Sequence, residues 1–281
     1  MSPLSPRFFT TSLLPVRERL VLKDGRSRKM DLRVRVGYFH HETFGHSLID
    51  TGYFTAQTLQ GLRVSPFLAI YRALLRPSTP TNDPLSSSLM QFDITRYQIQ
   101  TILVTHFHAD HIGRLRDFPE AKIICSRSAW TSYSRNSRVR NAVAGIFDVL
   151  IPDDIEKRLA FFEDYPSTAA PLGLGSGYEL LADGSLLAID LPGHAEGHVG
   201  FCFPRLATPL LYATDSQWLI TAILENRAPG FPASLVAADR GALRSSVKRV
   251  QEFVKRGGDV MLCHDPDSHP YDLDVDLEAR S

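Results

Sequence analysis

The chain has few cysteines, and none of them are spaced as a pair. Among its 281 residues only Cys125, Cys202 and Cys263 are cysteine, and no C-x-x-C motif occurs. An odd number of widely spaced thiols argues against a disulfide framework. Each cysteine lies in an apolar run that is typical of a strand. We therefore expect three buried free thiols in a reducing compartment, which indicates a cytoplasmic protein.

Long apolar runs and an excess of either charge are also missing. No apolar stretch approaches the roughly 20 residues of a membrane span. Pro3, Pro6 and Arg7 interrupt the first ten residues, so no secretion signal is expected. Lys plus Arg and Asp plus Glu are 31 each, so the formal net charge is zero. No overall positive potential therefore attracts nucleic acid or an anionic membrane. We expect a small-molecule substrate, and neither a nucleic-acid partner nor a membrane.

The most informative segment, residues 105–113, contains the motif H-x-H-x-D-H, formed by His106, His108, Asp110 and His111. It follows a short apolar run that predicts a strand. Alternation along a strand places His106 and His108 on one side. The chain can turn once the strand ends, which brings Asp110 and His111 close to these histidines. Imidazoles and a carboxylate suit zinc and neighbouring first-row metals. The motif therefore predicts a metal site.

Three further candidate ligands lie downstream, each at the end of a strand-like run: His194, Asp215 and His264. Open α/β sheets tend to place their sites at the carboxyl ends of strands. Two metals with one bridging carboxylate would use all of these side chains. We assign His106, His108 and His194 to one metal and Asp110, His111 and His264 to the other, with Asp215 between them. His269 competes with His264, which we favour because it directly follows its apolar run. Cys263 adjoins His264, and strand alternation would point its side chain away from the metal, so we do not count it as a ligand.

In this order the motifs resemble the metallo-β-lactamase superfamily, from about residue 34 to about residue 266. The resemblance rests on Leu48-Ile49-Asp50-Thr51-Gly52, the H-x-H-x-D-H motif, Pro192-Gly193-His194, Asp215 and His264. The histidine after Pro-Gly matches the family, which favours His194 over His198 as the ligand. Asp50 either orients a ligating imidazole or caps its turn. The resemblance implies two divalent metal ions, with zinc favoured and iron or manganese as alternatives.

The apolar pattern predicts an α/β fold. Strands are expected near 32–38, 46–50, 101–105, 121–125, 186–190, 199–203, 209–213 and 259–263, and helices over 66–75, from Asp239 to Gly257-Gly258, and from Asp153 or Asp154 through Phe162. Alternating strands and helices indicate a layered domain, and the resemblance implies a four-layer αβ/βα sandwich. We expect one domain over 1–281, with a core at about 32–266. A helical insertion at about 54–100 would wall the pocket, form a homodimer contact or do neither.

Within the superfamily the layout most resembles the N-acyl homoserine lactonases. That group commonly has a tyrosine three residues after the bridging aspartate, where this chain has Trp218. Indole donates one hydrogen bond but is no acid, and Tyr53 or Tyr212 could supply a hydroxyl instead. We take Asp110 and Trp218 as candidate catalytic residues, with Asp110 accepting a proton from the attacking water.

The expected reaction is hydrolysis of a small carbonyl ester, a lactone such as an acyl homoserine lactone, by a metal-bridging hydroxide. Three alternatives stay open. A thioesterase of the hydroxyacylglutathione type would need a basic cluster after His264, and none is clear. A phosphodiesterase is disfavoured by the neutral net charge. A non-catalytic metal-binding protein is disfavoured by the complete ligand set.

Overall fold

The computed structural model describes residues 4–79, 83–231 and 233–273. Its first sheet has six strands in sequence order: β1 (Arg7–Arg17), β2 (Lys29–His41), β3 (Gly45–Ile49), β4 (Ile99–Leu103), β5 (Lys122–Cys125) and β6 (Leu159–Phe161). Strands β1 to β3 pair antiparallel, and β3 to β6 pair parallel. The carboxyl ends of β3 to β6 therefore meet at one edge of this sheet.

The second sheet also has six strands, ordered β12-β11-β10-β9-β8-β7. They are β7 (Ser167–Ala169), β8 (Ser176–Glu179), β9 (Leu187–Asp190), β10 (Val199–Phe203), β11 (Leu210–Thr214) and β12 (Asp259–Leu262). Pairing is antiparallel except between β11 and β12, which are joined by a crossover with α7 (Ile220–Leu224) and α8 (Arg240–Lys255). A parallel pair needs such a long connection.

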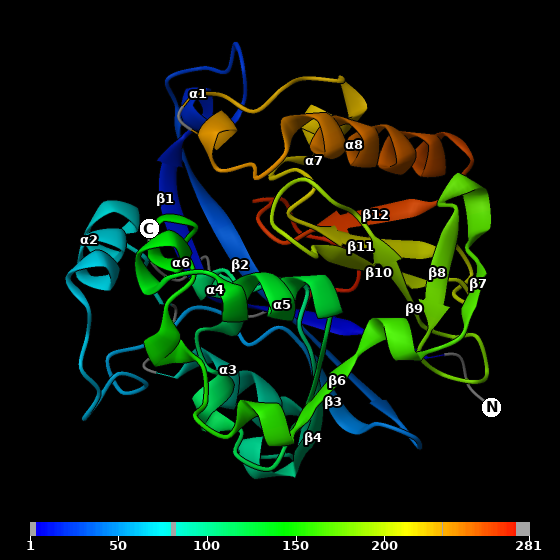
Figure 1. Cartoon of the computed structure of the whole chain (residues 1–281). Helices are drawn as coiled ribbons and strands as arrows, with labels where there is room; N and C mark the ends of the chain where they lie inside the picture. Colours follow the sequence, from blue (N-terminus) through cyan, green and yellow to red (C-terminus); the bar gives the residue numbers. More distant parts are fainter. Residues whose placement is uncertain (1–3, 80–82, 232, 274–281) are drawn as a thin grey trace.

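The two sheets face each other and form the central core (Figure 1). Side chains alternate along each strand, so Leu210 and Tyr212 of β11 join the core between the sheets, while Leu211 points outward. Outside the second sheet, Leu211 packs with Val250 and Phe253 of α8.

Helices cover the outer face of the first sheet as well. They are α2 (Pro66–Leu75), α3 (Pro84–Leu89), α4 (Ala109–Ile112), α5 (Arg127–Arg135) and α6 (Arg138–Val143). Leu68, Leu89 and Ala129 from these helices pack with Ile102 and Ile123 of the sheet. The short α1 (Glu18–Val21) follows β1. The predicted four-layer αβ/βα sandwich is confirmed.

Two predicted helices have the expected bounds. Helix α2 covers residues 66–75, and α8 begins after Asp239, whose side chain accepts hydrogen bonds from the N–H groups of Gly241 (2.7 Å) and Ala242 (3.0 Å). Such a carboxylate satisfies backbone donors that have no partner within the helix. The loop after α8 contains Gly257, as the sequence predicted.

One predicted helix was wrong, and four strands, β1 and β6 to β8, were not predicted. The helix expected from Asp153 or Asp154 through Phe162 is a single 3-10 turn at Ile155–Lys157 followed by β6, because Leu159 pairs with Ile123 at the sheet edge. The long strand β1 was missed, because Pro15 interrupts its pattern. Proline is tolerated there because β1 is an edge strand.

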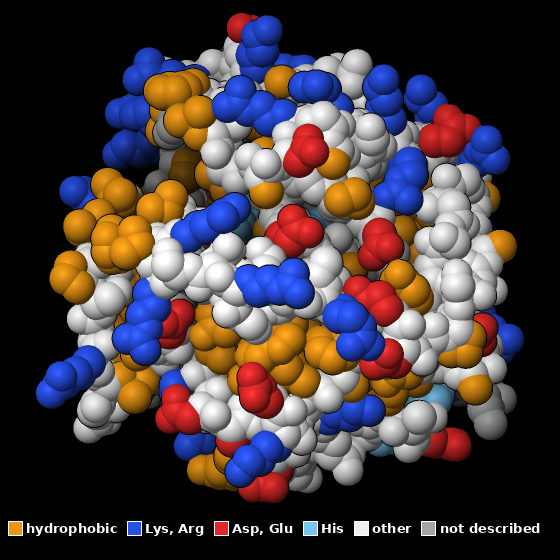
Figure 2. All heavy atoms as spheres, in the orientation of Figure 1, with side chains coloured by type: hydrophobic (Ala, Val, Ile, Leu, Met, Phe, Trp, Pro, Cys, Tyr) orange, Lys and Arg blue, Asp and Glu red, His pale blue; other side chains and the backbone are white. Residues whose placement is uncertain are grey.

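The apolar face of α2 is largely exposed. Only Leu68 of this helix is buried, while Phe67, Ile70 and Leu74 are exposed, Leu74 by 76%. They belong to the apolar surface over α2 at the left of Figure 2. The homodimer contact and the insertion at about 54–100 stay predictions, and residues 80–82 of that insertion lie outside the described part.

In the described part of the chain, every helix is too short or too polar to cross a membrane.

Candidate metal centre

The structure brings all seven predicted ligands to one place, at the ends of strands. His106 and His108 follow β4, and Asp110 and His111 lie in α4. From the second sheet, the ligands follow three different strands: His194 follows β9, Asp215 follows β11 and His264 follows β12. The site therefore lies where the two sheets meet at their strand ends.

His106, His108 and His194 form the first group of potential ligands. Their nearest ring nitrogens lie within 4.8 Å of one another, and His194 Nε2 is 3.1 Å from His108 Nδ1. Burial lowers the pKa of His106 and His194 well below the usual histidine range. His106 Nε2 is buried and lacks a hydrogen-bond partner among the described residues. Neutral imidazoles with a free nitrogen are the form that binds a metal ion.

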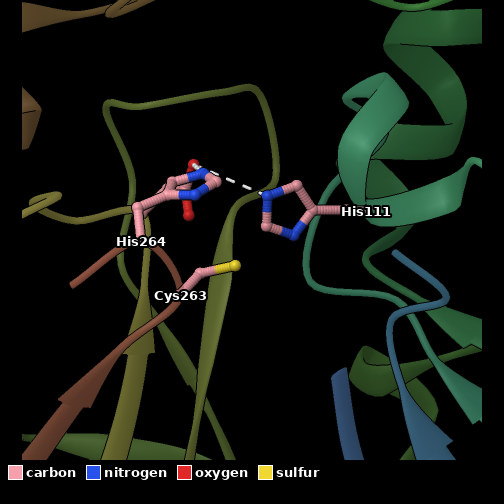
Figure 3. Close-up of side chains that lie close together, drawn as sticks. His111, Cys263 and His264 are labelled. Atoms are coloured by element: carbon pink, nitrogen blue, oxygen red, sulfur yellow. Dashed lines mark hydrogen bonds and ion pairs between the residues drawn. The ribbon is translucent and has the colours of Figure 1, made fainter. Parts of the chain in front are cut away.

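The second group contains His111, Asp215 and His264. Figure 3 shows the rings of His111 and His264 on opposite sides of this group. Asp215 Oδ2 is 3.5 Å from His111 Nε2 and 3.1 Å from His264 Nε2. Asp110 Oδ2 lies 3.4 Å from His264 Nε2 and 3.9 Å from His111 Nε2. The second set assigned from the sequence, Asp110 with His111 and His264, is thus assembled around Asp215.

Asp215 lies between the two groups. Its Oδ2 is also 3.3 Å from His194 Nε2, so one oxygen reaches ring nitrogens of both groups. Burial alone would raise the pKa of this carboxyl, but His264 and His111 outweigh it and hold the pKa well below its usual range. Asp215 is therefore an ionised carboxylate that two cations could share.

Cys263 belongs to the second group, contrary to the expectation that its side chain points away. Its sulfur lies within 4.8 Å of ligand atoms of His111, Asp215 and His264 (Figure 3). Strand alternation fails here because β12 ends at Leu262 and its register against β11 has already shifted. Burial raises the pKa of Cys263 to about 12, so the thiol stays protonated.

Asp50 orients His111. Its Oδ2 lies 2.7 Å from His111 Nδ1, and Thr105 donates to both carboxylate oxygens through its N–H and hydroxyl, each at 2.8 Å. A carboxylate on the far nitrogen fixes the ring so that Nε2 faces the site. Of the two roles left open by the sequence, the structure shows the orienting one.

The two competing histidines use their rings elsewhere. His198 donates from Nδ1 to the Leu191 carbonyl at 2.7 Å, and its Nε2 accepts from the Thr214 hydroxyl and the Asp215 N–H. His269 Nε2 lies 3.2 Å from Asp259 Oδ2. In each competing pair, His194 and His264 are therefore the histidines that direct a ring nitrogen into the site.

The turn that carries His194 is fixed to α8. Gly193 has φ +121°, and a Cβ there would lie 2.1 Å from the backbone nitrogen of Leu243. The Ser246 hydroxyl donates to the Pro192 carbonyl at 2.8 Å. Only glycine allows this close approach, so the position of His194 depends on α8.

Arg35 was missed by the sequence analysis, and it holds the segment that carries His264. Its side chain is buried, and its guanidinium donates to the carbonyls of Leu262 (3.0 Å) and Asp265 (2.7 Å). It also pairs with Asp272. A charged residue between Val34 and Val36 in a predicted strand was the available signal.

A cavity of about 480 Å³ opens beside Asp215 and Trp218. The Trp218 ring lies edge-on to His264, with centroids 6.0 Å apart. Tyr212 is in the core and donates to the Arg35 carbonyl at 3.4 Å, so its hydroxyl is engaged. The Tyr53 hydroxyl is buried without a partner among the described residues, and burial followed by the charge of Asp110 raises its pKa. Of the two tyrosines, Tyr53 is the one available near Asp110.

The chain is similar in sequence to proteins named as hydrolases. AttM of Azorhizobium caulinodans, named an N-acyl homoserine lactonase, is 27% identical over 186 residues, which cover 61% of this chain and 60% of AttM. A probable metallo-hydrolase of Mycobacterium tuberculosis, Rv2300c, is 26% identical over 240 residues, covering 79% of this chain and 72% of that protein. The chain thus spans only about 60% of the length of AttM.

Solved structures share the fold. B. thuringiensis AiiA, crystallised with N-decanoyl-L-homoserine at its active site, superposes with a TM-score of 0.67 at 17% identity, covering 94% of each chain. A probable metal-dependent hydrolase from Staphylococcus aureus superposes with a TM-score of 0.70 at 13% identity, covering 94% of this chain and 91% of that one. The family model described as the metallo-beta-lactamase superfamily matches residues 45–256, about three quarters of the chain. The chain belongs to the metallo-beta-lactamase superfamily.

Proposed function

We propose that the protein is a dinuclear metal-dependent hydrolase that opens a small carbonyl ester, a lactone such as an acyl homoserine lactone. One observation carries the proposal: Asp215 Oδ2 lies within 3.5 Å of ring nitrogens of His194, His111 and His264, which come from both ligand groups. A carboxylate so placed suits two cations that share it.

The donor set fits divalent metals. Five imidazoles and two carboxylates suit zinc, and iron or manganese accept the same ligands. His106 Nε2, His111 Nε2 and Asp215 Oδ1 are buried without hydrogen-bond partners among the described residues, which is costly unless a cation satisfies them. Bound divalent cations would activate water and polarise a carbonyl oxygen.

The residues of the chain have separate roles in this proposal. His106, His108 and His194 would hold one cation, and His111, His264 and Asp110 would hold the other. Asp110 also accepts the proton of the attacking water, because its carboxylate borders both His111 and His264. Trp218 lines the cavity and offers its indole N–H to the substrate.

A lactone is favoured because AttM is named an N-acyl homoserine lactonase and AiiA binds N-decanoyl-L-homoserine at its active site. The cavity volume is that of a small-molecule site. A cytoplasmic location remains part of the proposal, supported by three buried free cysteines. A homodimer is the remaining expectation, and sedimentation velocity would test it.

The direct test assays metal-loaded protein against acyl lactones, a lactoyl thioester and a phosphodiester, each with and without chelator. We expect chelator-sensitive opening of the lactone. Turnover of the phosphodiester alone would overturn the lactonase proposal, and thioester turnover alone would favour the hydroxyacylglutathione type.

Two variants test the site. His106→Ala should abolish activity and the binding of the metal assigned to His106, His108 and His194, with the fold retained. The control His40→Ala changes an exposed histidine outside the site and should retain activity and both metals. Asp110→Asn should retain at least one metal but lose roughly 10²-fold or more in kcat if Asp110 accepts the proton. An unchanged rate with both metals bound would refute that role.

A further inference from the structure

A row of basic side chains on α8 lines the same cavity as the proposed metal centre. Arg240, Arg244 and Lys248 are spaced four residues apart, which places them on one face of the helix. They border the cavity together with Asp215 and Trp218. The cavity therefore has the candidate metal centre at one part of its wall and a cationic row at another.

Two arginines near the row are engaged in the structure. Arg249 donates to backbone carbonyls of Leu174 (3.4 Å) and Asp190, and Arg256 pairs with Glu252 at 2.7 Å. Arg240, Arg244 and Lys248, in contrast, form no ion pair with any described residue within 4.0 Å. The three side chains are exposed and have no carboxylate partner among the described residues, so an anion in the cavity can reach them.

The row also opposes local helix stability. Like charges four residues apart repel by about 0.2–0.5 kcal/mol per pair. Arg240 lies in the first turn, where the helix dipole disfavours a cation, and the N-cap carboxylate of Asp239 is the acidic group at this end of the helix. A bound anion would relieve both effects.

The rest of the cavity wall has no carboxylate near the row. Asp215 is the only acidic residue among the described lining residues, and it belongs to the metal centre. Between the basic residues, Leu243 and Val247 are buried apolar side chains that also line the cavity. Such a wall fits a ligand with an apolar body and an anionic end.

We propose that the cavity takes a substrate that carries a carboxylate or phosphate group, which binds Arg244 and Lys248 while the ester reaches the metal centre. The inference rests on the proposed hydrolase function and specifies its substrate class. The spacing between the two parts of the cavity is fixed, because the turn carrying His194 is bonded to α8 through Ser246. The basic row therefore selects substrates by the distance between ester and anion.

The kinetic test compares two γ-lactones of equal length, one with a carboxylate and one with a methyl group at the end of its acyl chain. We expect the wild-type protein to have a higher kcat/KM for the carboxylated lactone, through a lower KM. Arg244→Ala/Lys248→Ala should reduce the ratio of the two kcat/KM values by about tenfold. Lys255→Ala removes an exposed basic residue of α8 outside the cavity and should leave the ratio unchanged.

A binding test separates the anion site from catalysis. Chelator-treated protein carrying Trp130→Phe, which leaves Trp218 as the remaining tryptophan, is titrated with hexanoate, hexyl phosphate and the neutral hexanamide. The fluorescence of Trp218 then reports occupancy of the cavity. We expect one or both anions to bind about tenfold or more tightly than hexanamide, with the advantage lost in Arg244→Ala/Lys248→Ala and kept in Lys255→Ala. The stronger of the two anions identifies the group recognised.

The outcomes are distinct. Equal affinity for anions and hexanamide, or an anion preference that persists in Arg244→Ala/Lys248→Ala, would overturn the inference. If the preference depends on these two residues but neither lactone is hydrolysed, the anion site stands and the proposed lactonase function is wrong.

Discussion

Arg35 and Asp272 form a buried bidentate ion pair that joins strand β2 to the segment after β12. Arg35 Nε and one terminal nitrogen each donate to a different oxygen of Asp272 at 2.9 Å. Because the Arg35 side chain is almost fully buried, water does not compete with Asp272 for its N–H groups. Through its bonds to the carbonyls of Leu262 and Asp265 it holds the backbone on both sides of His264.

Replacing Arg35 should therefore destabilise the protein strongly. In Arg35→Met, Asp272 is left as a buried charge without its partner, which costs roughly 3–5 kcal/mol. Arg35→Lys should recover only part of this, because an ammonium cannot reproduce the planar fork. Urea unfolding measures the loss, with Arg17→Met at an exposed position as the control. A loss below about 1 kcal/mol would contradict the role given to the pair.

Removing the carboxylate that orients His111 should weaken metal binding without unfolding the protein. Asp50→Asn loses the charged partner of His111 Nδ1, and we expect a 10- to 100-fold lower metal affinity, the range typical of such outer partners. Competition with a chromogenic chelator measures the affinity. Asp31→Asn changes an exposed carboxylate and serves as the control. Equal affinities for both variants would show that Asp50 only caps its turn.

Two glycine substitutions separate steric overlap from backbone strain. Gly193→Ala places a Cβ 2.1 Å from Leu243 N, whereas Gly257→Ala, also at positive φ, has open space around its Cβ. We expect about 1 kcal/mol of destabilisation for Gly257→Ala and at least 2 kcal/mol for Gly193→Ala. Gly193→Ala should also lower metal affinity, since the adjacent His194 must shift. Thermal unfolding and metal titration of both variants test this, and equal effects would contradict it.

Acid should remove the contribution of Asp83 to the free energy of unfolding. Burial alone would raise the pKa of this carboxyl, but hydrogen bonds from Arg114 and Ser86 outweigh it and lower the pKa from 3.8 to about 2. A lowered folded-state pKa stabilises the protein above the unfolded pKa, and the contribution disappears as the pH falls from about 4 to about 2. Asp83→Asn should thus cost about 1–2 kcal/mol at pH 7 and much less near pH 2. A pH-independent difference in unfolding free energy would contradict this.

The three cysteines should not react while the protein is folded. All are free and buried, and burial raises the pKa of Cys202 and Cys263 to about 12 each. Because the thiolate is the reactive form, we expect negligible labelling by a disulfide reagent at pH 8 and labelling of three thiols after denaturation. Rapid labelling of one native thiol would show that this part of the fold opens readily.

Much of the site could be predicted because its ligands follow strand-like runs. His194, Asp215 and His264 each end such a run, and sheet topology brings these ends together. The direction of Cys263 could not be predicted, since alternation stops where β12 ends. The sequence also could not predict that the cationic row on α8 lines the cavity. Periodicity identifies a helix face, but it does not show which part of the fold that face borders.

The ligands come from two continuous halves of the chain. Residues up to β6 form the first sheet and supply the H-x-H-x-D-H motif, whereas residues from β7 onward form the second sheet and supply His194, Asp215 and His264. A cation bound by both sets is in effect a reversible cross-link between the halves. Two fragments separated between β6 and β7 would then reassemble more tightly when metal is added, which makes the chain a natural starting point for a split, metal-gated reporter.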